Sequence, residues 1–305
     1  MKILVLGASG QVGSELGRQL DDVLSSGRQN YSVILASRSD ADVSDLPLLK
    51  DFLELNSPDW IINATAYTAV DAAETEIFQA HIVNETAIRV MAEYGVARGS
   101  RLVHISTDYV FDGSGEQPFR EASDASPLGV YGQSKLAGEE AIRATLRQHL
   151  ILRTAWVFGA SGGNFVKTML RLAETRSQLA VVGDQFGAPT SARAIAKAIA
   201  FLILQMSRAE SADERWGTYH YSGYPFVSWA EFASEIFHQA HEKSMIKLVP
   251  AVNAITTEEY PTPAKRPKNS RLDCSKIHAA FGIEPDHWRQ SLSKMLDEIK
   301  GVSAS

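Results

Sequence analysis

The sequence contains a single cysteine, Cys274, among its 305 residues. One cysteine excludes an internal disulfide and any metal site built from several thiolates, so we interpret Cys274 as a structural, unreactive thiol. The chain also lacks an apolar run near the ~20 residues that a membrane-spanning helix needs. We therefore expect neither a disulfide-stabilised fold nor a membrane protein.

Charge of one sign is not in large excess either. The chain has 30 Lys and Arg against 36 Asp and Glu, which gives a formal net charge of −6. This balance offers no general attraction to nucleic acid or to an anionic membrane, so we predict neither as a partner. This net charge is still compatible with a local basic pocket that binds an anionic substrate. Because the N-terminus has no basic segment followed by a cleavage site, we expect a cytoplasmic protein.

The first thirteen residues carry the most informative pattern that is present. A short apolar run from Ile3 to Leu6 is followed at once by Gly7, Gly10 and Gly13 and then by a helical pattern. This indicates a buried strand that turns tightly into a helix, with glycine allowing an unusual backbone angle and the close approach of a phosphate. The positive end of the helix then favours a pyrophosphate. A plain glycine-rich turn is the alternative, because G-x-x-G-x-x-G differs from the usual G-x-G-x-x-G.

Strand-like and helix-like segments alternate over the first half of the chain. Predicted helices lie at 11–26, 45–56, 72–98 and 133–148, and the strands between them at 3–6, 31–36, 60–63, 101–106 and 149–154. Such alternation predicts an α/β fold with a doubly wound parallel sheet of the Rossmann type and right-handed crossovers.

The rhythm changes beyond about residue 156. Further helices are predicted at 164–176, 191–207, 228–240 and 288–299, with strands near 179–182 and 218–222. We interpret this half as a smaller, interleaved domain. The nucleotide-binding domain would comprise 1–156 and about 191–223, and the substrate domain about 157–190 and 224–305. A cleft between them, at the carboxyl edge of the sheet, is where a substrate is expected.

Tyr131 and Lys135 stand four residues apart at the start of a predicted helix. Residues with this spacing share a helix face, so a phenol and an ammonium can point into the same cleft. A nearby ammonium is expected to lower the pKa of the tyrosine from about 10 and to make it a proton donor or acceptor near neutrality. A solvated surface pair is the alternative interpretation.

Polar residues end two of the predicted strands. Ser106 and Thr107 end the fourth strand, where a hydroxyl could donate to the oxygen of a reacting carbonyl. Asn63 to Ala66 end the third strand in the same way and should border the cofactor. A helix cap or a strand-end turn is the structural alternative.

Seven motifs, spread over nearly the whole chain, resemble those of a known family. They are GASGQVGSEL (7–16), NATAYTAVDAAE (63–74), STDYVFDG (106–113), VYGQSKLAGE (130–139), RTAWVFG (153–159), DQFGAPT (184–190) and YPTPAKRPKNSRLD (260–273). Together they resemble the extended short-chain dehydrogenase/reductases and, more narrowly, their dTDP-4-dehydrorhamnose reductase subfamily. The first and fourth motifs belong to the whole superfamily, and DQFGAPT and RPKNSRLD above all to the subfamily.

The resemblance implies roles for three residues. Tyr131 would be the general acid, Lys135 would bind the nicotinamide ribose and tune Tyr131, and Thr107 would orient the sugar carbonyl. The implied reaction transfers hydride from NADPH to the C4 ketone of dTDP-4-dehydro-L-rhamnose. Its product, dTDP-L-rhamnose, feeds bacterial surface polysaccharide such as the O-antigen of lipopolysaccharide.

Family analogy also implies the cofactor contacts. The glycine turn, with Gly7, Gly10, Gln11, Val12 and Gly13, would cradle the pyrophosphate. Further contacts would come from Asp42 and Val43 near adenine and from Ala66, Tyr67 and Thr68 near the nicotinamide. An NAD-preferring enzyme would carry Asp or Glu where this chain has Ser37 and Arg38. These two suit a 2′-phosphate, so we predict a preference for NADPH, with NADH as the alternative cofactor.

The substrate contacts implied by the resemblance lie mostly in the second half of the chain. They are Thr107, Asp108, Trp156, Gln185, Phe186, Arg266 and Arg271. Gln185 and Phe186 would read and stack on thymine, and the two arginines would clamp the diphosphate. Lys265 and Lys268 are interpreted as solvated. A core aromatic at a strand end is the alternative for Trp156.

One departure concerns metal. In some relatives an acidic cluster holds Mg²⁺ at a dimer interface. Glu15 and Glu298 are present here, but Arg193 stands where an acid is expected. A guanidinium cannot bind a cation, so we predict no metal site. The protein would be a monomer or a homodimer that needs no metal.

Four other functions occur on this fold, and the sequence argues against the first. A nucleotide-sugar dehydratase of this fold would carry Glu after Asp108, where this chain has Tyr109. An epimerase, or a reductase that makes another sugar, could keep all these motifs. A non-catalytic regulatory subunit that binds NADP is the alternative from another class, and the intact Tyr131, Lys135 and Thr107 argue against it.

Overall fold

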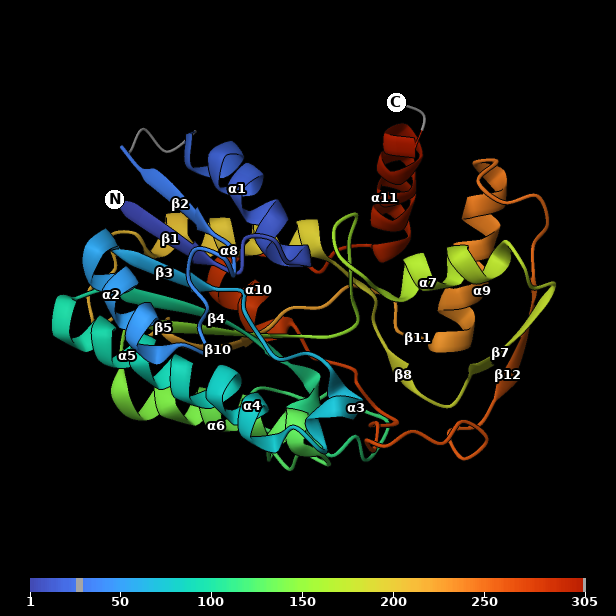
Figure 1. The fold of residues 1–305 in the computed structure, drawn as a ribbon, viewed down its shortest axis with the longest axis horizontal. Coiled ribbons are helices and arrows are strands. Elements are labelled where there is room, and N and C mark those ends of the chain that lie inside the picture. The colour runs from blue at the N-terminus through green and yellow to red at the C-terminus, as the bar shows by residue number, and fades with distance from the viewer. Residues whose placement is uncertain (26–29, 304–305) are drawn as a thin grey trace.

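The computed structural model describes residues 1–25 and 30–303. Its centre is a six-stranded sheet in the order β2-β1-β3-β4-β5-β10, with every neighbouring pair parallel (Figure 1). The strands are β1 (Lys2–Leu6), β2 (Ser32–Ala36), β3 (Trp60–Asn63), β4 (Arg101–Thr107), β5 (His149–Thr154) and β10 (Gly217–His220). The predicted doubly wound α/β fold is confirmed. Among the described helices, none combines the length and the apolar character that a membrane span requires.

Helices cover both faces of this sheet. On one side lie α1 (Gln11–Leu24), α8 (Ala192–Met206) and α10 (Ser275–Phe281), and on the other α2 (Leu46–Asn56), α5 (Ala87–Arg98) and α6 (Val130–Thr145). Within β1, Ile3 and Val5 pack with the first set, whereas Leu4 and Leu6 pack with the second. All four side chains are fully buried, which explains why the strand is apolar at every position.

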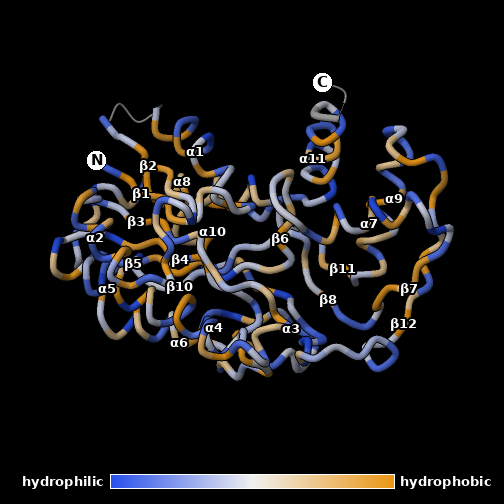
Figure 2. Tube along the Cα trace, viewed as in Figure 1, coloured by the Kyte–Doolittle hydropathy of each residue, from blue (hydrophilic) through white to orange (hydrophobic). Residues whose placement is uncertain are grey.

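A second hydrophobic cluster lies beside the sheet domain. It is formed by α7 (Phe165–Ala173), α9 (Trp229–Glu242) and α11 (Trp288–Ser303), and Figure 2 shows hydrophobic and hydrophilic residues alternating along these helices. Three two-stranded ladders accompany them: β6 (Val157–Phe158) with β9 (Thr190–Ser191), β7 (Gln178–Val182) with β12 (Ala251–Ile255), and β8 (Phe186–Gly187) with β11 (Val227–Ser228). The chain therefore crosses between the sheet and this cluster several times.

The single helix predicted over 72–98 is wrong. The segment forms α3 (Val70–Ala73), α4 (Ile77–His81), a π-helical turn (Ile82–Thr86) and then α5. The Asn84 side chain lies in the π-helical turn, where it bonds the backbone N–H and C=O of Tyr67 and the hydroxyl of Ser134. These contacts stabilise the irregular turn, and hydrophobic periodicity carries no information about them.

Other boundaries differ by a few residues. The helix predicted over 133–148 runs from Val130 to Thr145, which places Tyr131 and Lys135 in its first two turns. The helix predicted to residue 26 ends at Leu24, and residue 26 itself lies outside the described residues. The strand β12 and the helix α10 were not predicted, because each is short and gains its order from a partner far away in the sequence.

Candidate active site

The glycine turn between β1 and α1 is closely packed. Gly7 has φ +85°, and a Cβ there would lie 2.9 Å from the backbone of Ala64. A Cβ on Gly13 would lie 2.0 Å from the carbonyl oxygen of Gly7, so that position accepts glycine alone. Gly10 is the N-cap of α1 and has no side chain that could bond the first amides of the helix. The turn therefore fits a dinucleotide pyrophosphate, which those amides would bind.

Two adjoining cavities open at this turn. The outer cavity, about 670 Å³, is lined by the turn, by residues 41–44 and by α4. The inner cavity, about 390 Å³, lies over the carboxyl ends of β3, β4 and β5 and includes residues of α6. Both are bordered by Gly10 and by residues 64–66, so they form one continuous depression along the sheet edge. This is the position where doubly wound folds bind dinucleotides.

The predicted cofactor residues are distributed over these walls. Gly7, Arg38, Asp42, Val43 and Tyr67 line the outer cavity. The inner cavity has Gln11, Val12 and Thr68, and both cavities have Gly10 and Ala66. Gly13 is buried behind the turn, where its role is to let the helix approach β1.

The segment that would select the cofactor is held by carboxylates. Arg38, which is exposed, donates from Nε to Oδ2 of Asp42 at 2.9 Å. Ser37 is not part of either cavity wall; its hydroxyl donates to Asp40 at 2.6 Å. A 2′-phosphate bound here would therefore compete with Asp42 for Arg38.

Tyr131 and Lys135 reach the inner cavity from the start of α6. Thr107 reaches it from the end of β4, so the structure brings the three predicted catalytic residues together. The N-terminus of α6 is held by Glu74, whose Oε1 accepts the Val130 N–H at 2.9 Å. The ring of Tyr131 packs edge-on against Tyr109, with centroids 5.4 Å apart.

The expected lowering of the tyrosine pKa is wrong for this structure. Burial raises the pKa of Tyr131 to about 12, although a hydrogen bond with Thr107 opposes part of the rise. Lys135 does not offset this rise in the pKa of Tyr131, because its ammonium is directed to other groups. Its Nζ donates to the carbonyl oxygen of Ile105 at 2.7 Å and lies 3.3 Å from Nε2 of His104. Burial lowers the pKa of Lys135 to about 8, against a raising effect of Glu139.

Asp108 is the acidic group of the inner cavity. It is 4% exposed, and burial raises its pKa from 3.8 to about 6. Its Oδ1 accepts from the Thr107 hydroxyl at 3.0 Å, whereas Oδ2 has no hydrogen-bond partner within the described part of the chain. The Thr154 hydroxyl also has no hydrogen-bond partner among the described residues. Two buried polar atoms of this wall, Asp108 Oδ2 and the Thr154 hydroxyl oxygen, are therefore available to a ligand.

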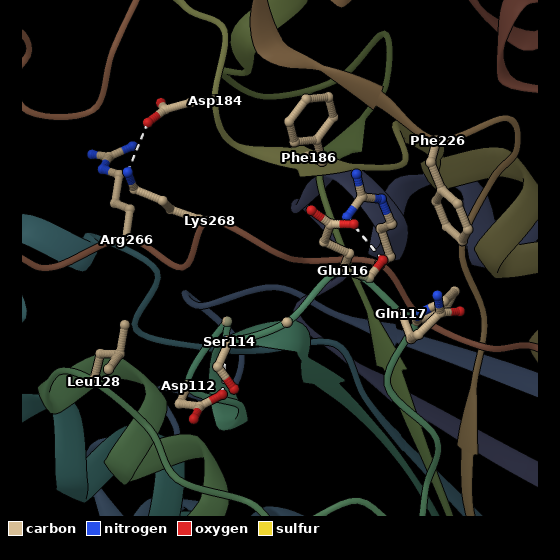
Figure 3. Close-up of a pocket in the computed structure, with 14 residues that line it drawn as sticks. Asp112, Ser114, Glu116, Gln117, Leu128, Asp184, Phe186, Phe226, Arg266 and Lys268 are labelled. Carbon is tan, nitrogen blue, oxygen red and sulfur yellow. Dashed lines mark hydrogen bonds and ion pairs between the residues drawn. The ribbon is translucent and has the colours of Figure 1, made fainter.

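Figure 3 shows a third and larger cavity of about 1,050 Å³, which we call the wide cavity. Its walls are the loop 112–118, Leu128, Asp184, Phe186, Phe226, Arg266, Lys268 and Arg271. The guanidinium of Arg271 covers the ring of Phe186, with Cζ 4.6 Å from the centroid. Aromatic and cationic groups thus face the same space, as a nucleoside diphosphate would require.

Two of the three basic side chains in this wall, Arg266 and Lys268, already have acidic partners, whereas Arg271 donates to the backbone carbonyl of Glu116 and to Oδ1 of Asn269. Arg266 pairs with Asp71 of α3 at 2.9 Å, although its buried Nε has no partner among the described residues. Lys268 was interpreted as solvated; it is exposed and pairs with Asp184 at 2.9 Å and Glu258 at 3.0 Å. A bound diphosphate would have to compete with these carboxylates.

Of two further predicted substrate residues, Trp156 lies in a cavity wall and Gln185 does not. Gln185 is buried outside the described walls of the wide cavity, and its amide donates to Thr257 at 3.2 Å. Trp156, at φ +49°, lines the inner cavity and stacks on Trp229 with ring centroids 3.6 Å apart. Its ring also lies against Gly187, the residue after Phe186 of the wide cavity. Trp156 is therefore both a packed aromatic and a cavity wall.

The residues at the expected Mg²⁺ cluster do not fit a cation. Arg193 occupies the space between the acids, with Nε 3.1 Å from Oε2 of Glu15 and an Nη 2.5 Å from Oε2 of Glu298. Across residues 1–25 and 30–303, no three His, Cys, Asp or Glu side chains gather as a metal site would need. The guanidinium supplies the positive charge that the two carboxylates need.

Sequence reasoning missed several wall residues. Ser9, Ser44 and Glu76 line the outer cavity, and the loop 112–118 forms much of the wide one. His104 was also missed, because a histidine within an apolar strand carries no signal of its own. Its pairing with Asn63 across the parallel ladder could have been found by aligning the two strand ends.

Comparisons with known proteins agree with this geometry. The family model described as "RmlD substrate binding domain" matches residues 1–300. A dTDP-4-dehydrorhamnose reductase of Aggregatibacter actinomycetemcomitans is 42% identical over 294 residues, which cover 96% of this chain and 98% of the relative. The crystal structure of such a reductase from Clostridium acetobutylicum has a TM-score of 0.88 at 35% identity and covers 98% of this chain and 100% of its own. One from Bacillus anthracis in complex with NADP has a TM-score of 0.85 at 31% identity, with 97% and 99% covered.

Proposed function

Because the chain belongs to the RmlD substrate binding domain family, we propose that it reduces the C4 ketone of dTDP-4-dehydro-L-rhamnose with NADPH, forming dTDP-L-rhamnose. The resemblance inferred from the motifs is confirmed by the family match and by relatives at 42% identity over nearly full length. The chain is an oxidoreductase of this family. The nucleotide sugar, the cofactor preference and the supply of bacterial surface polysaccharide are part of the proposal.

One observation carries the proposal. Tyr131, Lys135 and Thr107 meet in the inner cavity, which is continuous with the cavity at the glycine turn. A ketone placed there would lie beside a phenol and a hydroxyl and next to the space for a nicotinamide. This arrangement suits the delivery of a proton to a carbonyl oxygen.

The residues of this chain would act as follows. When bound, NADPH supplies the hydride. The first amides of α1 hold the pyrophosphate, and Thr107 orients the carbonyl oxygen. Tyr131 gives its phenolic proton to the oxygen that becomes an alkoxide. Its raised pKa of about 12 keeps it protonated at neutral pH, as a donor in reduction needs.

The preference for NADPH would rest on Arg38. Its guanidinium lies at the rim of the outer cavity, where its exposed position lets it leave Asp42 for a 2′-phosphate. Asp42 would then remain available to a ribose hydroxyl. NADH therefore stays the weaker alternative cofactor in this proposal.

The nucleotide of the substrate would occupy the wide cavity. Phe186 offers a ring for the base, and Arg266 and Arg271 offer guanidinium groups for the diphosphate. In this proposal residues 1–156 and about 191–223 bind the cofactor, whereas about 157–190 and 224–305 bind the nucleotide sugar. Trp156 lies where the two parts meet.

The direct test is an absorbance assay at the NADPH band. Purified protein should oxidise NADPH when dTDP-4-dehydro-L-rhamnose is added, more slowly with NADH, and NMR of the product should show the L-rhamno configuration. Binding of NADPH without oxidation would support the regulatory-subunit alternative. A different product configuration would assign another reductase or an epimerase.

Tyr131→Phe tests the proton donor. Loss of the phenol should lower kcat by about 100-fold or more, while the affinity for NADPH stays nearly unchanged. The matched control is Tyr221→Phe, which removes a hydroxyl from another buried tyrosine, one that lines a separate cavity near α8. Retained turnover in Tyr131→Phe would contradict the assigned role.

A further inference from the structure

A chain of buried polar groups leads from the end of β3 to Lys135. Asn63 Oδ1 accepts the backbone N–H of Thr65 at 3.0 Å and the Thr65 hydroxyl at 2.6 Å. Its Nδ2 lies 3.0 Å from Nδ1 of His104, and Nε2 of His104 lies 3.3 Å from Nζ of Lys135. Asn63 and His104 are completely buried and Lys135 is 1% exposed, so water does not replace these partners.

The first link fixes the orientation of the asparagine amide. A backbone N–H can only donate, so the Asn63 atom that faces Thr65 must be the oxygen. The amide nitrogen therefore faces His104. An amide N–H₂ can only donate, so Nδ1 of His104 must be the acceptor.

This in turn fixes the tautomer of the imidazole. A neutral histidine carries one ring proton, and with Nδ1 accepting it must reside on Nε2. Burial and the nearby charge of Lys135 hold the pKa of His104 well below its usual value, so the ring stays neutral. The N–H at Nε2 then points at the lysine nitrogen. It can donate to an amine, but an ammonium offers no lone pair to accept it.

We propose that Asn63 and His104 are positioning residues that present an N–H donor to Lys135, favour its amine form, and so make its ammonium a readier proton donor. The carbonyl of Ile105 accepts from either form and only holds Nζ in place. The effect on the proton equilibrium of Lys135 thus comes from His104.

Other charged groups lie around Lys135 and His104. Glu139, one turn along α6, acts in the opposite sense on Lys135. Its carboxylate is bonded to Arg153 of β5, to Arg143 of α6 and to the Ser106 hydroxyl. On the cavity side lie Tyr131 and Asp108. With Glu139 neutralised by two arginines, His104 is the one described polar group whose donor faces Nζ.

The consequence for turnover rests on the proposed function. Each reduction would leave Tyr131 as a phenolate that must regain a proton before the next cycle. An ammonium destabilised at Lys135 gives up its proton to that phenolate more readily. The Asn63–His104 pair would therefore contribute to reprotonation of Tyr131, while neither residue touches the substrate.

The tautomer can be observed without any activity assay. A ¹H–¹⁵N spectrum of protein with ¹⁵N-labelled histidine should show the His104 proton on Nε2, with Nδ1 bare, from pH 6 to 9. A neutron crystal structure of the wild-type protein would give the same information and needs no variant. A proton on Nδ1 in either experiment overturns the proposal.

The variant Asn63→Asp is expected to move the ring proton of His104 from Nε2 to Nδ1. A carboxylate accepts from Thr65 with one oxygen and from His104 Nδ1–H with the other, so Nε2 becomes an acceptor for the ammonium. The matched control is Asn84→Asp, which makes the same change at another buried asparagine that contacts Tyr67 and Ser134 and not His104. Only Asn63→Asp should place a proton on Nδ1 of His104.

The pH profile of kcat provides the functional measurement. In Asn63→Asp the upper limb, above which activity falls, should move to higher pH by about 1 unit. Asn84→Asp should leave the limb in place. An unmoved limb in Asn63→Asp, with the tautomer reversed, refutes the link to Lys135. If the wild-type protein reduces no nucleotide sugar, the proposed function fails, whereas the spectrum still decides the tautomer.

Discussion

The walls of the inner and wide cavities are held by different means. The inner cavity is bounded by strand ends and by the first turns of α6, with Thr107, Asp108 and Lys135 all at most 6% exposed. The wide cavity is bounded by loops, and its charged walls are joined by ion pairs such as Lys268–Asp184, whose side chains are 53% and 30% exposed. One wall is fixed by buried hydrogen bonds, and the other can exchange its partners with solvent or a ligand.

This difference suits the two tasks that the proposed function requires. Proton transfer needs groups held within a few tenths of an ångström, which buried strand ends provide. Binding a large nucleotide needs charges that can be released to a phosphate, which half-exposed ion pairs provide at little energetic cost. The following three predictions test whether the contrast holds.

The largest effect is expected at the buried ion pair behind the inner cavity. Glu139 is fully buried and bonds Arg153 at 2.7 and 2.8 Å. Burial by itself would raise the pKa of Glu139, but these arginine contacts lower it. Glu139→Ala leaves two guanidinium groups without their carboxylate and should lower the free energy of unfolding by about 3 to 5 kcal/mol in urea titrations. Asp184→Ala, in the wide cavity, should lower the free energy of unfolding much less, because solvent screens its partner Lys268. Equal losses of unfolding free energy in the two variants would contradict the difference between the two cavity walls.

A smaller effect, with a definite sign, is expected from Asp108. Its folded-state pKa of about 6 exceeds the ordinary 3.8, so its contribution to stability is complete below pH 3.8 and is lost as the pH rises through 6. Asp108→Asn should match the wild-type protein near pH 3.5 and exceed its unfolding free energy by about 2 to 3 kcal/mol at pH 7. Denaturant titrations at several pH values measure this difference.

Asp112, in the wall of the wide cavity, is the matched control. A hydrogen bond from the Ser114 backbone N–H lowers the pKa of Asp112, so its contribution is present above pH 3.8 and is lost as the pH falls. Asp112→Asn should therefore be less stable than the wild-type protein at pH 7. The same sign for both variants would contradict the assigned burial of Asp108.

The smallest effect concerns substrate binding in the wide cavity. Arg266→Gln removes a charge-assisted contact to the proposed diphosphate and should raise KM for the nucleotide sugar by about 10- to 30-fold. Steady-state kinetics should show kcat and the KM for NADPH nearly unchanged. Lys265→Gln, an exposed neighbour, is the control and should change neither constant. A fall in kcat alone would place Arg266 in the chemistry instead.

Local patterns in the sequence determined much of this protein. The alternation of strands and helices predicted the parallel sheet, and the spacing of Gly7, Gly10 and Gly13 predicted the turn at α1. Tyr131 and Lys135 were found from a spacing of four residues. In each of these features the residues are close together in the chain, so their pattern is visible without the fold.

Only the tertiary structure decided which atoms face one another. Lys135 points to His104, 31 residues away, which is why the expected effect on Tyr131 is absent. Arg266 is held by Asp71, 195 residues away, and the contacts of Asn84 with Tyr67 and Ser134 hold the π-helical turn. Contacts over such separations depend on how the strands and helices pack, and neither periodicity nor the spacing of residues specifies that packing.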